Sequence, residues 1–186
     1  MNTEQVLNTI SREITEVVGS VNAEEAEQAA VRINRAPRIF VAGEGRSGLV
    51  GKMFAMRLMH SGYNVFVVGE TITPSVSEGD LLVVLSGSGN TPILVHTAEQ
   101  AKKSGAELLV CSTNRASSLG KISSAFIEIP AATKKRLEHE PETIQPLGNQ
   151  FDQSLHLILD GLIIAAVHAG GNADYEQMAR RHSNME

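Results

Sequence analysis

The chain has 186 residues, of which 42% are hydrophobic and only 4% aromatic, and its 21 acidic side chains outnumber 16 basic ones. This length suits one domain with its own core, and the negative balance argues against nucleic acid or an anionic membrane as a partner. The single cysteine, Cys111, cannot form an intramolecular disulfide and is expected in the core rather than as a nucleophile. The opening residues show no basic segment followed by an apolar run, so we expect a cytosolic protein.

Two helices are predicted before the first strand. Apolar residues at helical spacing mark the first helix between Val6 and Val17, and a segment rich in Ala and Glu predicts the second over residues 23–34. Short apolar runs then predict strands buried on both faces, and helical patterns lie between several of them. This alternation predicts a doubly wound parallel sheet. The strands are expected at 38–42, 65–68, 81–85, 108–111 and 126–129, and the helices between them at 47–61, 92–104 and 117–123.

The last part of the chain begins with a polar segment, residues 131–147, which carries two prolines and no clear period. It is predicted to be a loop of a length that is often functional. A long helix is expected over 149–169, and polar side chains interrupt it too often for a membrane span. A short helix is expected over 173–181. The expected organisation is one domain, 1–186, made of N-terminal helices (1–36), an αβα core (37–170), and a C-terminal helix and tail (171–186).

Two glycine-rich loops each follow a predicted strand and precede a predicted helix. The first, Gly43–Gly48, matches the dinucleotide fingerprint G-x-G-x-x-G, and Glu70 lies near the offset at which such sites hold a ribose hydroxyl. A dinucleotide site would not require the second loop, Ser86–Thr91, whose hydroxyls, backbone N–H groups and helix dipole suit one compact dianion. We therefore expect a phosphate site, although tight turns would also explain each loop.

The phosphate site is expected to draw on both loops. Ser47 can add a hydroxyl, while Gly45 and Gly48 would let the backbone approach the ligand closely. Arg46 could balance the phosphate charge or form an ordinary ion pair. The predicted binding residues are Ser47, Ser86, Gly87, Ser88, Gly89, Asn90 and Thr91, with Arg46 and Glu70 as further candidates.

At these loops the sequence resembles the sugar isomerase (SIS) domain and, within it, the 6-phospho-3-hexuloisomerases. The resemblance covers nearly the whole chain and implies, together with the strand pattern, a three-layer αβα sandwich with a five-stranded parallel sheet. It implies conversion of D-arabino-3-hexulose 6-phosphate to fructose 6-phosphate, the second step of formaldehyde fixation in the ribulose monophosphate route, by a homotetramer without a cofactor. The segments that carry it are the two loops, Phe54–His60, Val68–Glu70, Thr73–Pro74, Gln145–Gly148 and Arg181–Asn184.

The implied reaction moves a carbonyl from C3 to C2 through an enediolate, which requires a base for the C2 proton. The resemblance places that base directly after Phe151, where the family carries Glu and this chain has Asp152. Asp withdraws the carboxylate by about one C–C bond, and a displacement near 1 Å can cost on the order of a hundredfold in rate. An acid in a first helical turn, facing the helix dipole, is the other explanation of Asp152.

Histidines supply the second candidate group. The related isomerases suggest a histidine that reaches the site from a neighbouring subunit, and His182 in the tail would fill that role, although terminal histidines are commonly just solvated. His60 is expected to cap a helix dipole. Asp152, His156 and Asp160 share one helical stripe that could suit a metal, but no further ligand is indicated and we expect none.

Two other functions stay open from sequence. A non-catalytic sugar-phosphate sensor would use the same phosphate loops, although no basic recognition helix is visible. A dinucleotide-dependent oxidoreductase would use the first loop, although the chain is short for the separate substrate domain that most such enzymes carry. Within the isomerases, phosphorylated pentoses and heptuloses remain alternative substrates.

Overall fold

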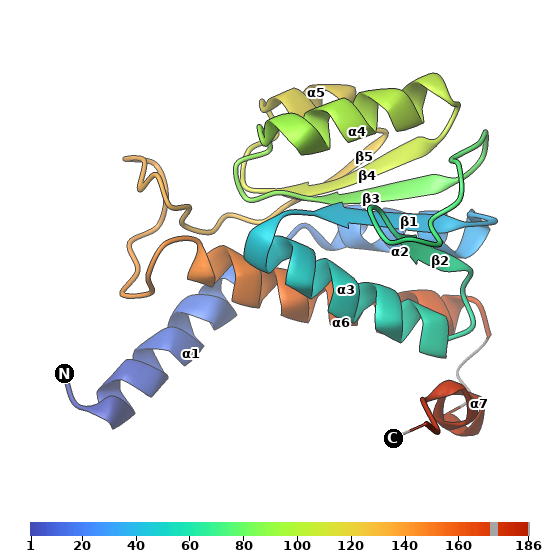
Figure 1. Cartoon of the computed structure of the whole chain (residues 1–186). Helices are drawn as coiled ribbons and strands as arrows, with labels where there is room; N and C mark the ends of the chain where they lie inside the picture. Colours follow the sequence, from blue (N-terminus) through green and yellow to red (C-terminus); the bar gives the residue numbers. More distant parts are fainter. Residues whose placement is uncertain (172–174, 186) are drawn as a thin grey trace.

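The computed structural model describes residues 1–171 and 175–185 and contains a five-stranded sheet between two layers of helices (Figure 1). The strands are β1 (Ile39–Gly43), β2 (Val65–Val67), β3 (Leu81–Leu85), β4 (Glu107–Ser112) and β5 (Ala125–Glu128). Their order across the sheet is β2-β1-β3-β4-β5, and every neighbouring pair is parallel. The predicted three-layer αβα fold is thereby confirmed.

The helices divide between the two faces of the sheet (Figure 1). One layer contains α2 (Ala23–Arg35), α3 (Gly45–His60) and α6 (Asn149–Ala169), with α1 (Thr3–Gly19) packed against α6. The other contains α4 (Pro92–Lys103) and α5 (Ser118–Ile122). Helix α7 (Tyr175–Arg181) contacts α3. Within the described part of the chain, no helix is long and apolar enough to cross a membrane.

Alternating strand residues build two separate cores, one under each helical layer. Ile39 and Val41 of β1 pack with α2, α3 and α6, whereas Phe40 and Ala42 pack with α4 and α5. Successive side chains of a strand point to opposite faces, so a strand covered on both sides must be apolar at every position. Cys111 is fully buried in the first core, and burial raises the pKa of its thiol to about 12, as expected of a core residue.

The expected element boundaries hold to within one or two residues, except that α1 begins at Thr3, three residues before Val6. The range 149–169 is the whole of α6, and residues 131–147 form neither helix nor strand. Helix α3 begins at Gly45 rather than at Ser47, since the Glu44 carbonyl already accepts from Gly48 N–H. Gly45 has φ of +57°, which another residue would adopt only with strain. The expected start of the last helix, at Ala173, and residue 186 lie outside the described residues.

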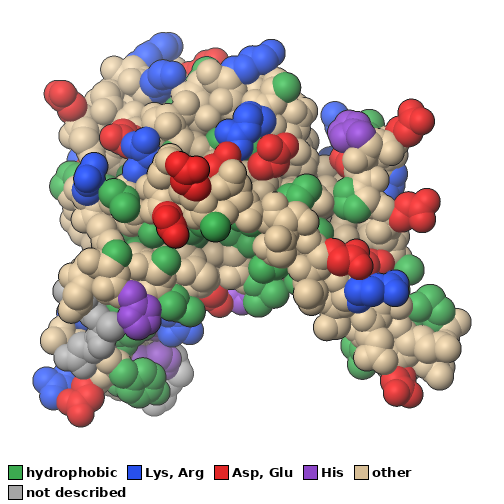
Figure 2. All heavy atoms as spheres, turned by 180° about the vertical axis from the view of Figure 1, so that it is seen from behind, with side chains coloured by type: hydrophobic (Ala, Val, Ile, Leu, Met, Phe, Trp, Pro, Cys, Tyr) green, Lys and Arg blue, Asp and Glu red, His purple; other side chains and the backbone are tan. Residues whose placement is uncertain are grey.

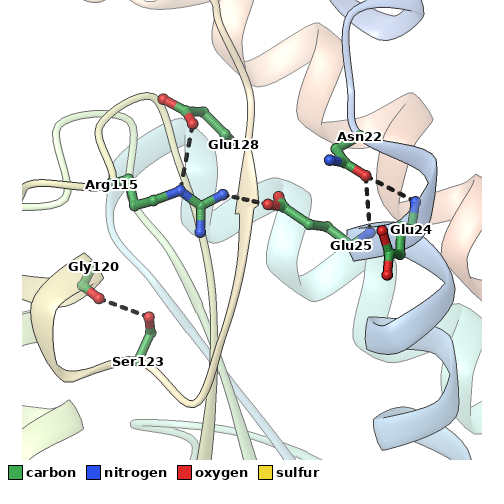
Figure 3. A network of polar contacts seen from close by, with 7 residues as sticks. All are labelled: Asn22, Glu24, Glu25, Arg115, Gly120, Ser123 and Glu128. Carbon is green, nitrogen blue, oxygen red and sulfur yellow. Dashed lines mark hydrogen bonds and ion pairs between the residues drawn. The ribbon is translucent and has the colours of Figure 1, made fainter.

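An ion-pair network ties the edge of the sheet to the N-terminus of α2 (Figure 3). Arg115 donates to Glu25 of α2 at 2.6 Å, lies 3.6 Å from the Glu128 carboxylate, and places its guanidinium over the Phe126 ring. Asn22 caps α2 by accepting from the backbone of Glu24 and Glu25. Because Arg115 follows β4, this network fixes the loop at the carboxyl end of that strand.

Candidate active site

A cavity of about 560 Å³ opens at the carboxyl ends of β1 and β3. Helix α3 leaves β1 toward one face of the sheet and α4 leaves β3 toward the other, so these neighbouring strands form the topological switch point at which α/β sheets bind ligands. The lining residues are Glu44, Gly45, Arg46, Ser47, Gly87, Ser88, Asn90, Thr91, Pro92, Thr133, Lys134, Lys135, Leu147, Gly148, Phe151 and Asp152.

Three helix N-termini meet at this cavity without side-chain caps. The N-cap residues of α3, α4 and α6 are Glu44, Thr91 and Gly148; all three line the cavity, and none accepts a capping hydrogen bond through its side chain. Helices α1, α2 and α5, whose N-termini lie elsewhere, are all capped by Asn or Ser side chains. The first N–H groups of a helix need acceptors, and the positive dipole end favours an anion. The arrangement is therefore suited to a phosphate.

The second loop is rigid, and its own hydrogen bonds hold it. Ser86 is buried, lies 3.1 Å from the Thr91 hydroxyl and accepts from Gly89 N–H at 3.2 Å. The Gly87 carbonyl accepts from Thr113 at the end of β4. Gly89 has φ of +65°, and a Cβ there would lie 2.1 Å from the Ser117 hydroxyl, so the position requires glycine. The loop is thus preorganised before any ligand arrives.

The glycines of the first loop serve the fold as well as the site. A Cβ on Gly48 would lie 2.5 Å from the Gly43 carbonyl oxygen, so Gly48 is needed for close packing of α3 against the end of β1. Gly48 does not line the cavity, and this packing accounts for the glycine at that position. Gly45 has open space around its Cβ position and lines the cavity, in agreement with the role predicted for it.

Asp152 lies at the wall of the cavity, 7% exposed, in the first turn of α6. Its Oδ1 accepts a hydrogen bond of 2.8 Å from the Ser47 hydroxyl, and its Oδ2 accepts from Arg46 Nε at 3.2 Å. Both donors belong to the first turn of α3, so two helix N-termini together orient one carboxylate. A carboxylate can accept a proton, and this one is held beside three open helix N-termini that suit an anion.

Comparison with known proteins identifies the family. The model of the SIS domain matches residues 32–141, more than half of the chain. The chain belongs to the SIS domain family. Helices α1 and α6, and with them Asp152, lie outside the matched segment.

Relatives of this SIS domain protein match over its full length. It is 40% identical to the 3-hexulose-6-phosphate isomerase of Bacillus subtilis, over 100% of both chains, and 39% identical to that of Mycobacterium gastri, over 97% of this chain and 89% of the relative. A Methanococcus jannaschii crystal structure, described as inferring a molecular function of 3-hexulose-6-phosphate isomerase, superposes with a TM-score of 0.80 and 30% identity, covering 97% of this chain and 98% of the other.

Four of the predicted site residues do not line the SIS cavity. Ser86 and Gly89 belong to the second loop but are not part of the lining, and Glu70 and His182 lie elsewhere. Glu70 does not line it and pairs instead with Lys52 at 2.6 Å on the surface. His182 stacks on His60, with ring centroids 5.2 Å apart, at the opposite end of α3 from Ser47. A rise of 1.5 Å per residue separates the two ends by about 20 Å. Within one chain, His182 cannot reach Asp152.

His60 is the last residue of α3, where the sequence predicted a helix-dipole cap. It is buried at the end of α3, and burial, together with the charges of Arg57 and His182, lowers its pKa. The helical stripe that was weighed as a metal site does not bring its three side chains together. His156 pairs with Asp160 at 3.7 Å, whereas Asp152 faces α3.

The sequence interpretation missed the contribution of the polar segment 131–147. Thr133, Lys134 and Lys135 line the cavity, and the two lysines add positive charge beside the second loop. Glu140 closes the turn that presents them by accepting from the Thr133 hydroxyl at 2.6 Å. The signal was a Lys-Lys pair in a segment already expected to be functional, although no spacing linked it to the glycine loops.

Proposed function

We propose that this protein converts D-arabino-3-hexulose 6-phosphate to fructose 6-phosphate. The observation that carries the proposal is the full-length match, at 33–40% identity, to 3-hexulose-6-phosphate isomerases of three bacteria. The cavity agrees with it, since a cradle for one phosphate and a fixed carboxylate, Asp152, line the same space. Phosphate binding far from the reacting carbons would fix the register of the sugar.

In the proposed reaction Asp152 takes the proton from C2. The electrons of the C2–H bond form a C2=C3 double bond, and the C3 carbonyl oxygen becomes an enediolate oxygen. The C3 oxygen takes up the proton that the C2 hydroxyl gives up. Return of the proton from Asp152 to C3 then leaves a carbonyl at C2 and a hydroxyl at C3. The second loop, through Gly87, Ser88, Asn90 and Thr91, and the open N-termini of α3, α4 and α6 would hold the phosphate. Lys134 and Lys135 would balance its charge.

The second proton-transfer group, in this proposal, is His182 from a neighbouring copy of the chain. Helices α1 and α7 project from the same side of the body (Figure 1), and the surface between them is hollowed, with hydrophobic side chains along its edge (Figure 2). Exposed apolar side chains on the adjacent helices α3 and α6 suit a second copy better than water. They are Leu49, Met53, Met56, Leu157 and Ile164. The proposed assembly is a homo-oligomer, a tetramer if the family resemblance extends to assembly.

Substitution of Asp152 tests the assigned reaction. Asp152→Asn keeps the shape but removes the base, and we expect the rate of fructose 6-phosphate formation to fall by at least about a hundredfold. Asp152→Glu extends the carboxylate and is expected to retain or raise turnover. Steady-state kinetics on 3-hexulose 6-phosphate measure both. Native protein that binds sugar phosphates but forms no fructose 6-phosphate would contradict the proposal and favour a sensor.

A further inference from the structure

A continuous chain of hydrogen bonds joins Asp152 to a buried carboxylate on α1. Arg46, which donates to Asp152, also donates through Nη2 to Asn149 Oδ1 at 2.5 Å. Asn149 Nδ2 donates to Gln145 Oε1 at 2.9 Å, and Gln145 Nε2 donates to Glu13 Oε2 at 2.9 Å. We call this series, Arg46–Asn149–Gln145–Glu13, the α1 relay.

The chemistry of the two ends fixes the direction of every bond in the α1 relay. A guanidinium can only donate and an ionised carboxylate can only accept, so each amide between them must present its oxygen toward Arg46 and its NH₂ toward Glu13. A flipped amide at either position would set two donors or two acceptors against each other. Bonds aligned from a cation to an anion polarise one another, which makes the series stronger than isolated pairs.

Burial makes the far end of the α1 relay a firm anchor. Glu13 is 6% exposed and Gln145 is 2% exposed. Glu13 also accepts from the Thr143 hydroxyl at 2.5 Å and from Ile144 N–H at 3.0 Å. One α1 carboxylate thus holds three successive residues of the segment that leads into α6. A buried polar group that loses its partner is costly, so this anchor has one stable arrangement.

Arg46, at the end of the α1 relay next to Asp152, is the residue whose orientation the relay must fix. The Arg46 side chain is 65% exposed at the edge of the cavity, where a free arginine would sample many rotamers. Two fixed acceptors, Asp152 Oδ2 and Asn149 Oδ1, hold two of its nitrogens. Its third nitrogen, Nη1, has no hydrogen-bond partner among the described residues 1–171 and 175–185 and is left for a substrate oxygen.

We propose that Asn149 and Gln145 are positioning residues, which act through Arg46 to hold the guanidinium against Asp152 and toward the reacting sugar. Glu13 anchors them, so the N-terminal helix contributes to the reaction without touching the substrate. This inference rests on the proposed isomerase function and deepens it. Positioning of this kind affects the rate of the chemical step more than it affects ground-state binding.

A double-mutant cycle between Asn149 and Arg46 tests the α1 relay. Asn149→Ala is expected to lower kcat roughly tenfold with KM for 3-hexulose 6-phosphate changed by less than about threefold. In an Arg46→Ala background the same Asn149→Ala change is expected to have no further effect on kcat, because the group through which it acts is gone. Full additivity of the two losses would overturn the inference.

Gln145 and Gln150 form a matched pair of controls. Both are buried amides, each 2% exposed. Both also hold the 131–147 segment, since Gln145 belongs to it and Gln150 accepts from Ala132 N–H at 2.8 Å. Only Gln145 belongs to the α1 relay. Gln145→Met and Gln150→Met are expected to lower the thermal midpoint to a similar degree, but only Gln145→Met should lower kcat by several-fold. Equal losses of kcat in both would mean that the segment, not the relay, matters.

Failure of the α1 relay can be told apart from failure of the proposed function. Wild-type protein that forms no fructose 6-phosphate removes the function, whatever the variants do. The cycle is then read in the urea midpoint of unfolding, where Asn149→Ala should have a smaller effect once Arg46 is replaced. The bond from Asn149 to Gln145 is lost in either background, but the bond from Arg46 is lost only where Arg46 is present. If the wild-type protein is active but the Arg46 and Asn149 substitutions act independently, the proposed function stands and the relay is wrong.

Discussion

Asp152 is one C–C bond shorter than the Glu that the family resemblance implies at this position. Its hydrogen-bond partners show how the shorter side chain is held. Ser47 and Arg46 each fix one of its oxygens, so the carboxylate has little freedom to lose when a substrate binds. Ser47 was expected among the phosphate ligands, whereas its hydroxyl donates to Asp152. Sequence could not reveal this pairing, since 105 positions separate the two residues and neither belongs to a motif that includes the other.

Glu13 makes folding sensitive to acid. Burial raises the pKa of Glu13, but the hydrogen bonds from Thr143, Gln145 and Ile144 together lower it by more. The pKa of Glu13 therefore lies below its ordinary value of 4.5. The ionised form is therefore stabilised by folding, and this stability is present above about pH 4.5 and is lost as the pH falls through the folded-state pKa.

Glu13→Gln should accordingly cost about 1–3 kcal/mol of unfolding free energy at pH 7, because buried donors lose a charged acceptor. The difference from wild-type protein should shrink at a low pH, below the folded-state pKa of Glu13, where the wild-type carboxylate also protonates. Urea unfolding at pH 7 and at that low pH measures it. Glu16→Gln, on an exposed turn of the same helix, is the control and should show little difference at either pH. A constant gap between Glu13→Gln and wild type would contradict the assignment.

At the scale of elements, the strands and helices follow directly from apolar periodicity, because each strand is covered on both faces and each helix has one buried face. The conformation of the 131–147 segment does not follow from periodicity. Its conformation depends on Glu13, more than a hundred positions away, and on Glu140 closing a local turn. A candidate phosphate site was nevertheless predictable at this scale, since a glycine loop that opens a helix exposes backbone donors whatever the rest of the fold contributes.

The open N-terminus of α4 gives an element-scale prediction. Thr91→Asp would place a carboxylate at its N-cap, where it can accept from the first N–H groups and meet the helix dipole. We expect a stabilisation of roughly 0.5–1 kcal/mol and a KM for the sugar phosphate raised at least about tenfold by repulsion of the phosphate. Asn22→Asp, at the N-cap of α2 far from the cavity, is the matched control and should leave KM unchanged. An unaltered KM in Thr91→Asp would remove α4 from the phosphate site.

For the whole molecule, the distance between His182 and Asp152 is the decisive feature. Arg181 donates to the His60 carbonyl at 3.2 Å, and this contact holds the start of the tail against the end of α3. The fold of one chain therefore sets the proposed base and the proposed histidine at opposite ends of a helix. Sequence alone could place both residues only relative to their own elements. Whether they share a site depends on how copies of the chain assemble, which the exposed faces of α3 and α6 favour.

Mixing two inactive variants tests that assembly directly. Asp152→Asn lacks the base and His182→Ala lacks the tail histidine, so each alone should form fructose 6-phosphate at no more than about a hundredth of the wild-type rate. If each site takes Asp152 from one copy and His182 from another, unfolding the two variants together and refolding them should create some sites with both residues intact. Activity should then rise well above the sum of the two separate variants, and light scattering should give a mass larger than one chain. Met56→Glu on the exposed face of α3 should abolish both the larger mass and the recovered activity. A monomer that retains full activity would contradict this assembly, because one chain would then carry out the whole reaction.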